Sequence, residues 1–171
     1  MSEKRTALRI SLLVISAAIV AVFTLIVRIP SMIGGYISLC DAAITFVSIA
    51  FGPVVGFVAG GLGTAMADIV GGYPQWALIS FIVHGVEGLV IGIILKHLPG
   101  WAGKIVAIIW TTAVVAGGYL ALTTLAGLAT FSEAVAEVVG NVLQGGVGSV
   151  IGTLLYTAVR AAYPRLDNLR W

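Results

Sequence analysis

The sequence predicts an all-α protein that crosses a membrane several times, and its composition is the first reason. Of its 171 residues, 60% are hydrophobic and 9% are charged, whereas about 25% are charged in an ordinary soluble domain. Nine Lys and Arg and seven Asp and Glu are too few to cover a soluble fold of this length. These numbers exclude a water-soluble enzyme, and a net charge of +2 is too small for a nucleic-acid-binding protein.

Long uncharged runs are the second reason, and they divide into six predicted helices in one domain over residues 1–171. The run Ile10–Val27 nearly spans a hydrocarbon core of about 30 Å at about 1.5 Å per residue. The run Ala42–Ala67 contains Pro53, which lacks an amide donor and restricts the residue before it, so we split this run into two short helices. The predicted helices cover about residues 9–28, 41–51, 54–70, 76–95, 105–127 and 133–160.

The placement of basic residues is the third reason, because cytoplasmic loops collect Lys and Arg. With six helices, eight of the nine basic residues fall on one side: Lys4, Arg5, Arg9, Lys96, Lys104, Arg160, Arg165 and Arg170. A single span over residues 42–70 would break this bias, so a helical pair or a re-entrant hairpin is favoured there. Both termini are then cytoplasmic. The outer loop 29–40 is long and Gly-rich, and we expect it to act as a lid.

Small residues recur at four-residue spacing, which lets helix backbones approach closely in lipid. Most of these pairs are expected to pack helices of the chain against one another: Gly52, Gly56 and Gly60; Gly88 and Gly92; Gly148 and Gly152. Ala17 and Ala21 lie on an otherwise bulky first helix and are the better candidates for docking another membrane protein. The chain has no GxxxxGK[ST] or complete GxGxxG motif, so no nucleotide loop is predicted.

Polar groups within the predicted helices are functional candidates by default, because ionisable groups are costly in hydrocarbon. Helical spacing places Ser80, His84 and Glu87 on one face, and a second polar face follows on the last helix. We therefore expect a polar chamber in the outer half of the bundle that binds a small neutral or basic molecule. Its predicted residues are Tyr36, His84, Glu87, Tyr119, Thr123, Glu137, Asn141 and Gln144.

A structural role is the alternative for these groups: His84 and Glu87 pair with each other, or with Gln144, and only hold helices together. Asp41 is an N-cap candidate, and Asp68 needs a partner, for which Arg28 is available. Cys40, the one cysteine, is expected to be a small buried thiol. No Cys/His cluster has zinc spacing, so neither a metal site nor a cofactor is predicted.

Several segments carry a resemblance to a known family: GGYISLCD at 34–41, FGPVVG at 51–56, Gly60 to Asp68, GGYPQW at 71–76 and GVEG at 85–88. The pattern resumes with Glu137, the NVLQ segment at 141–144 and Gly148. With these residues the chain resembles the substrate-binding S component of an energy-coupling factor (ECF) transporter, in the group named after riboflavin transport. The likeness covers residues 30–95 closely and 133–160 more loosely.

The resemblance implies a six-helix, vitamin-binding protein of the prokaryotic cell membrane, with an outer cavity under a lid. It also implies partners: a transmembrane T component, docked on the stripe that Ala17 and Ala21 match here, and two cytoplasmic ATPases. Transport would then be a toppling of the whole S component. His84 stands where relatives often carry Lys, so a ligand does not transfer from them. Candidates are riboflavin, a pyridoxine-like ring and a hydroxymethylpyrimidine-like ring.

Two other functions compete with vitamin capture. The first is a stand-alone proton-coupled carrier with His84, Glu87 and Glu137 as its relay; such carriers usually have more helices and internal repeats, and no repeat is evident here. The second is a membrane enzyme, but the sequence contains no GxSxG or HExxH motif.

Overall fold

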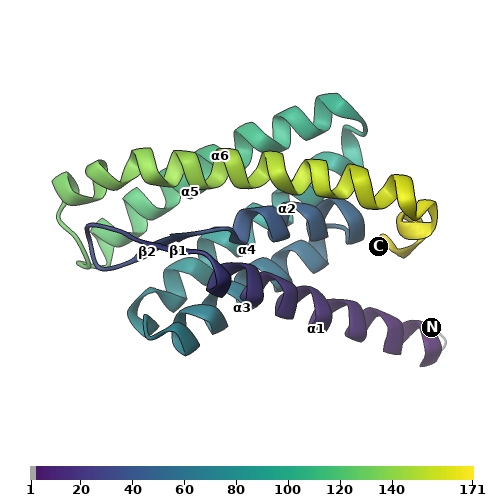
Figure 1. Cartoon of the computed structure of the whole chain (residues 1–171), viewed down its shortest axis with the longest axis horizontal. Coiled ribbons are helices and arrows are strands. Elements are labelled where there is room, and N and C mark those ends of the chain that lie inside the picture. The colour runs from purple at the N-terminus through teal and green to yellow at the C-terminus, as the bar shows by residue number, and fades with distance from the viewer. Residues whose placement is uncertain (1–2) are drawn as a thin grey trace.

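The computed structural model describes residues 3–171, apart from the side chain of Lys4, and it is an elongated helical bundle with one short hairpin (Figure 1). Among these residues, five helices are long and apolar enough to cross a membrane, α1, α3, α4 with the short helix before it, α5 and α6, so the all-α prediction is confirmed. The elements are α1 (Glu3–Ile26), β1 (Arg28–Pro30), β2 (Tyr36–Ser38), α2 (Cys40–Phe51), α3 (Pro53–Gly71), η1 (Pro74–Trp76), α4 (Ala77–His97), α5 (Trp101–Leu125), α6 (Phe131–Ala162) and η2 (Pro164–Leu169).

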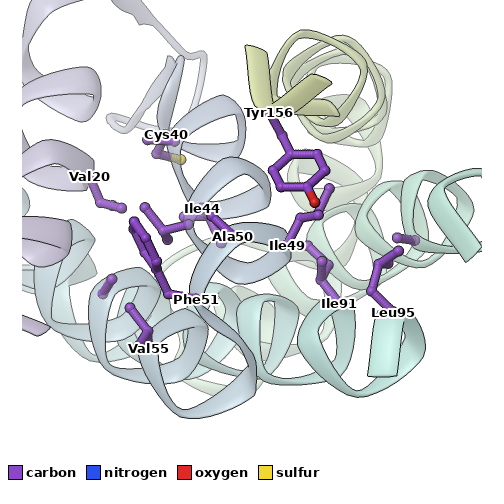
Figure 2. Close-up of a cluster of buried hydrophobic side chains, with 14 of the residues drawn as sticks. Val20, Cys40, Ile44, Ile49, Ala50, Phe51, Val55, Ile91, Leu95 and Tyr156 are labelled. Atoms are coloured by element: carbon purple, nitrogen blue, oxygen red, sulfur yellow. The ribbon is translucent and has the colours of Figure 1, made fainter. Parts of the chain in front are cut away.

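The helix α2 is the centre of the bundle. Every one of its residues except Phe46 is buried. Figure 2 shows its side chains among those of α1, α3, α4 and α6, and the cluster includes Val20, Val55, Ile91 and Tyr156. With 12 residues it is about 18 Å long, too short to cross a 30 Å hydrocarbon core by itself.

The predicted break between the second and third helices lies at Gly52, as Pro53 indicated. Gly52 has φ +99°, a conformation that side-chain-bearing residues rarely adopt, and Pro53 begins α3. The last residue of the chain reinforces this joint: the Trp171 amide donates to the Phe51 carbonyl at 3.2 Å, and the Trp171 carbonyl occupies the place of a Cβ at Gly52.

Glycines bring α3 and α4 into backbone contact. A Cβ at Gly56 would meet the carbonyl of Gly88, and one at Gly60 would meet the carbonyl of His84. Gly148 and Gly152 of α6 pack in the same way against α2. The prediction that most small-residue pairs serve internal packing is confirmed for these.

The Ala17/Ala21 stripe also takes part in packing within the chain. Both residues are partly buried, and the carbonyl of Ala17 lies 2.8 Å from where a Cβ at Gly63 of α3 would be. Part of this stripe therefore faces α3, and its role in docking a partner stays a prediction.

Several element boundaries differ from the prediction, and α1 covers Glu3–Ile26 instead of about residues 9–28. α5 begins at Trp101, directly after Gly100 with φ +85°, so Lys104 lies inside the helix. α6 begins at Phe131, because Thr130 and Glu133 form a capping box. The expected outer loop contains a two-stranded antiparallel hairpin in which Ile29 lies opposite Ile37.

The bundle has two distinct ends. The β1–β2 hairpin lies at one end, which we call the hairpin end, and both chain termini lie at the other, the terminal end (Figure 1). At the terminal end, Arg9 lies over the ring of Trp171 and Arg160 pairs with Asp167 at 2.8 Å. The first contact joins the two termini, and the second fixes the C-terminal segment to the end of α6.

Candidate functional site

A polar cavity of about 40 Å³ lies inside the hairpin end of the bundle. Its wall combines the hairpin with residues from the hairpin-end halves of α1 and α3 to α6 and from the start of α2. Seven of the eight predicted binding residues line it: Tyr36, His84, Tyr119, Thr123, Glu137, Asn141 and Gln144. The structure therefore brings together residues that the sequence placed on three separate helices and a loop.

The roof of the cavity is the hairpin, and two predicted residues of α6 hold it in place. Glu137 accepts a hydrogen bond from the Met32 amide at 2.7 Å, and Gln144 accepts one from the Ser38 amide, also at 2.7 Å. Trp76 adds a third bond, from its indole N–H to the Gly34 carbonyl. In this closed arrangement Glu137 and Gln144 bind the protein's own backbone.

The wall formed by α4 and α5 carries a chain of polar side chains. The Ser80 hydroxyl lies 2.8 Å from the Tyr119 hydroxyl, which lies 3.3 Å from His84 Nε2. His84 Nδ1 is in turn 2.7 Å from Glu87 Oε2. Thr123, one turn further along α5, bonds the carbonyl of Tyr119.

The position of Glu87 differs from the prediction that it contacts the substrate directly. It is fully buried and does not line the cavity, which it reaches only through His84. His84 does pair with Glu87, as the structural alternative predicts. The other side of its imidazole faces the cavity.

The prediction of an Asp68–Arg28 pair is wrong. Asp68 lines the cavity and accepts a hydrogen bond from the Tyr36 hydroxyl, whereas Arg28 donates to the Gly71 carbonyl at 3.3 Å. Burial, followed by the hydrogen bond to the Asp68 carboxylate, raises the pKa of Tyr36. Tyr36 therefore stays protonated and remains a donor at the cavity wall.

Asp41 is not an N-cap. The N-cap of α2 is Leu39, and Asp41 lies in the first turn, fully buried, where the positive end of the helix dipole favours its charge. The Cys40 thiol lies 3.3 Å from Asp41 Oδ2 and 3.6 Å from His84 Nε2. The expectation of a small buried thiol is confirmed, and this thiol belongs to a cluster with Asp41 and His84.

Sequence reasoning missed several lining residues, chiefly Asp68 and Trp76, with the hydroxyl groups of Thr24, Thr64 and Ser38. Thr64 and Asp68 are four residues apart and so share a face of α3. This spacing could have identified both residues as candidates from the sequence. Thr24 offered no comparable signal, because its hydroxyl bonds the carbonyl of Val20 within its own helix.

The fold and the cavity together define a class: a polytopic membrane protein that encloses a polar site at one end of its helix bundle. A family model described as "ECF-type riboflavin transporter, S component" matches residues 4–161. The chain belongs to this family. It is accordingly a multi-pass membrane subunit of a transporter and not an enzyme, as predicted.

Relatives in other organisms cover most of the chain. An "uncharacterized protein in gap 3' region" of Pyrococcus woesei is 35% identical over 134 residues, which are 78% of this chain and 88% of that protein. A UPF0397 protein of Streptococcus thermophilus is 31% identical over 153 residues, 82% and 83% of the two chains. A UPF0397 protein of Streptococcus agalactiae is 29% identical over 171 residues, 91% of each.

Proposed function

We propose that this S component captures a small water-soluble vitamin or vitamin precursor from outside the cell for ATP-driven uptake. The observation that carries the proposal is the composition of the cavity wall. Tyr36, Trp76 and Tyr119 offer aromatic faces for a heterocyclic ring, while Asn141, Gln144 and Glu137 offer hydrogen bonds to its polar groups. A small hydroxylated heterocycle, such as a pyridoxine-like or hydroxymethylpyrimidine-like ring or riboflavin, fits this combination.

The size of the cavity supports a mobile roof. A buried water needs about 10–15 Å³, so a cavity of about 40 Å³ holds roughly three waters. Ligand pockets enclose several hundred Å³. Capture of a vitamin therefore requires the hairpin to move outward. This movement breaks its hydrogen bonds to Glu137, Gln144 and Trp76, and those of Tyr36 to Asp68 and Arg28 to Gly71.

The distribution of charge supports an orientation with six membrane segments and the hairpin end outside. Seven of the eight basic residues whose side chains are described belong to the terminal end, and only Arg28 belongs to the hairpin end. Because cytoplasmic loops collect Lys and Arg, both termini are placed in the cytoplasm. In this arrangement α2 crosses only about half of the membrane, and it follows the strand β2 in the chain.

The partners follow from the family: a transmembrane T component and two cytoplasmic ATPases. Of the five long helices, α1 has the smallest buried fraction, so its outer face is available to another membrane protein. We place the T component along α1, beside Ala17 and Ala21, where small side chains allow close approach.

The test starts with purified protein, from which the co-purified ligand is identified by mass spectrometry and then titrated back. We expect one such vitamin to bind at or below micromolar concentration. Asn141→Ala should weaken this binding about 10-fold or more through a lost hydrogen bond. Val139→Ala, on the lipid-facing side of the same helix with 68% exposure, is the matched control and should bind normally.

Two results would contradict the proposal. One is the absence of binding by every candidate vitamin at micromolar concentration. The other is uptake that persists in vesicles lacking the ATPases and stops when the proton gradient is collapsed, which would favour the stand-alone carrier instead.

A further inference from the structure

A buried cluster of ionisable side chains lies at the inner wall of the cavity, between the start of α2 and the middle of α4. Its members are Cys40, Asp41, His84 and Glu87, which are 1%, 0%, 2% and 0% exposed. Cys40 Sγ is 3.3 Å from Asp41 Oδ2 and 3.6 Å from His84 Nε2. One donor atom from each of Cys40, Asp41 and His84 lies within 4.8 Å of the others.

The cluster contains two carboxyl groups and little to balance them. Within the described part of the chain, the ion pairs that reach Asp41 or Glu87 both come from His84, at 3.8 Å and 2.7 Å. Asp41 Oδ1 and Glu87 Oε1 are buried and have no hydrogen-bond partner among the described residues. Buried carboxylates are ordinarily paired with cations or bound to metals, so a cation bound here would balance the charge of the cluster.

The geometry matches a metal site. In tetrahedral coordination, metal–sulfur bonds of about 2.3 Å and metal–nitrogen bonds of about 2.0–2.1 Å place sulfur and nitrogen about 3.6 Å apart. Cys40 Sγ and His84 Nε2 are separated by 3.6 Å. An ion can therefore bind both atoms with little change in their positions.

The surroundings of His84 also match. Its Nδ1 bonds the Glu87 carboxylate at 2.7 Å, the arrangement by which an outer carboxylate orients a metal-binding histidine. With Nδ1 as the donor, Nε2 carries the free lone pair, and this atom faces Cys40 and the Tyr119 hydroxyl. Gln144 lies on the other side of Cys40, with its amide nitrogen 3.8 Å from the sulfur.

We propose that Cys40 Sγ, an Asp41 carboxylate oxygen and His84 Nε2 bind a divalent transition-metal ion, with Glu87 as the outer carboxylate that orients His84. Sulfur, imidazole and carboxylate ligands together favour Zn²⁺, Co²⁺ or Ni²⁺ over Mg²⁺ and Ca²⁺. On binding, the Cys40 S–H bond is replaced by a metal–sulfur bond and the proton leaves to solvent. The thiolate and the Asp41 carboxylate then balance the two positive charges, and the Glu87 carboxylate keeps its hydrogen bond from His84 Nδ1.

The proposed metal site lies at the wall of the cavity. Cys40 and His84 line the cavity, whereas Asp41 lies behind them. The fourth coordination position therefore faces the space that holds the substrate, where a water or a nitrogen or oxygen atom of a heterocycle can occupy it. This inference goes beyond vitamin capture, since the site consists only of protein side chains and binds the ion without a vitamin.

The experiment uses the purified full chain, free of vitamin, with Co²⁺ as the probe. We expect one Co²⁺ per chain, visible bands of tetrahedral Co²⁺ and a near-ultraviolet charge-transfer band from the single cysteine. Cys40→Ser should abolish the charge-transfer band and weaken binding, because a thiolate ligand is lost, and Asp41→Asn and His84→Gln should also weaken it. Glu87→Gln should weaken binding about 10–100-fold. His97→Gln, which changes the exposed histidine at the end of the same helix, is the matched control and should change nothing.

A second measurement needs no variant that alters the thiol. Cys40 is the only cysteine, so alkylation of the wild-type protein reports on it alone. Zn²⁺ should slow this alkylation in the wild type and in His97→Gln, but not in His84→Gln. Absence of both the charge-transfer band and the protection at micromolar metal would overturn the proposal, as would a band that survives in Cys40→Ser. Vitamin titration in the presence of a chelator, performed separately, tests the proposed function itself.

Discussion

Glu137 connects the last long helix to the roof of the cavity through one hydrogen bond. Its carboxylate accepts from the Met32 amide at 2.7 Å and is almost completely buried. Hydrogen bonds to charged groups contribute about 1.5–3 kcal/mol, more than a neutral pair. This single side chain therefore sets much of the free energy that keeps the hairpin closed.

Replacing Glu137 by Ala should open the hairpin. We expect the backbone amides of residues 31–36 to exchange with solvent about 10-fold faster or more, given the loss of a charged hydrogen bond, and the bound vitamin to dissociate faster. Hydrogen–deuterium exchange with mass spectrometry measures the first effect and stopped-flow release the second. Glu137→Gln keeps an acceptor and should retain most of the protection, while Val135→Ala, exposed on the same helix, serves as control. Equal exchange in Glu137→Ala and the wild type would contradict this role.

At the scale of residues, the sequence located the site better than it assigned roles. Helical spacing placed Asn141 and Gln144 on one face of the last helix, because side chains three residues apart share a face, and both line the cavity. Spacing does not reveal which helix lies opposite, so it missed that Asp41 meets His84 and that Asp68 meets Tyr36. It also placed Glu87 on the cavity, since a helical face does not show how deeply a residue on its edge is buried.

At the scale of elements, the contact between α3 and α4 depends on the absence of side chains. The backbones of Gly56 and Gly88 touch, and the Ser48 hydroxyl of α2 also lies within reach of Gly56. Such close approach strengthens van der Waals packing in a membrane, where the hydrophobic effect does not drive helices together. These glycines therefore fix the distance between the two helices that carry Asp68 and His84.

Gly56→Ala should push α3 and α4 apart. Overpacking of this kind costs about 1–3 kcal/mol, which corresponds to a fall in melting temperature of about 2–12 °C for a chain of this size. Thermal unfolding in detergent, followed by tryptophan fluorescence, measures it. Gly117→Ala is the matched control, because no described atom lies within 4 Å of a Cβ at that position of α5. Should the two variants melt at the same temperature, the close packing would not contribute to stability.

Among the elements, the break at Pro53 and the five long helices could be predicted, because proline chemistry and apolar length are local properties of the sequence. The hairpin could not. Its strands have three residues each, and their pairing depends on bonds to Glu137, Gln144 and Trp76, which lie far away in the chain.

At the scale of the whole molecule, the two ends of the bundle differ in chemistry. The terminal end holds most of the basic residues, with contacts such as Arg9 on Trp171 and Lys104 on Thr157. The hairpin end holds the cavity and its carboxyl and hydroxyl groups. We expect this asymmetry to orient the protein, with the basic end toward the negatively charged inner leaflet.

Labelling of introduced cysteines tests the orientation. Gln75, Glu3 and Arg165 are exposed at opposite ends, and each is replaced by Cys in turn. A membrane-impermeant thiol reagent should label Gln75→Cys in intact cells, but Glu3→Cys and Arg165→Cys only after permeabilisation. The wild type, whose one cysteine is buried, gives the background. Labelling of Glu3→Cys and Arg165→Cys on opposite sides would rule out six membrane segments.

The composition of the whole chain indicated a membrane protein, because scarcity of charge is independent of how helices pack. Charge placement predicted that both termini lie at the same end of the bundle as the loop between α4 and α5. The contacts of Arg9 with Trp171 and of Lys104 with Thr157 agree with this prediction. The arrangement of helices around α2 could not be predicted from the sequence, since every long helix is apolar on several sides.

The burial of α2 also bears on how the protein enters the membrane during synthesis. Its 12 residues include Asp41, Thr45 and Ser48, and an ionisable group such as Asp41 opposes insertion of a membrane segment. A segment this short and polar is a poor substrate for insertion by itself. We expect α2 to be integrated together with α3, as one hairpin through the Gly52–Pro53 joint, and to become stable only when α6, made last, covers its polar side. Biogenesis would then be cooperative: the earlier helices are inserted in sequence, but the binding site exists only after the final helix is in place.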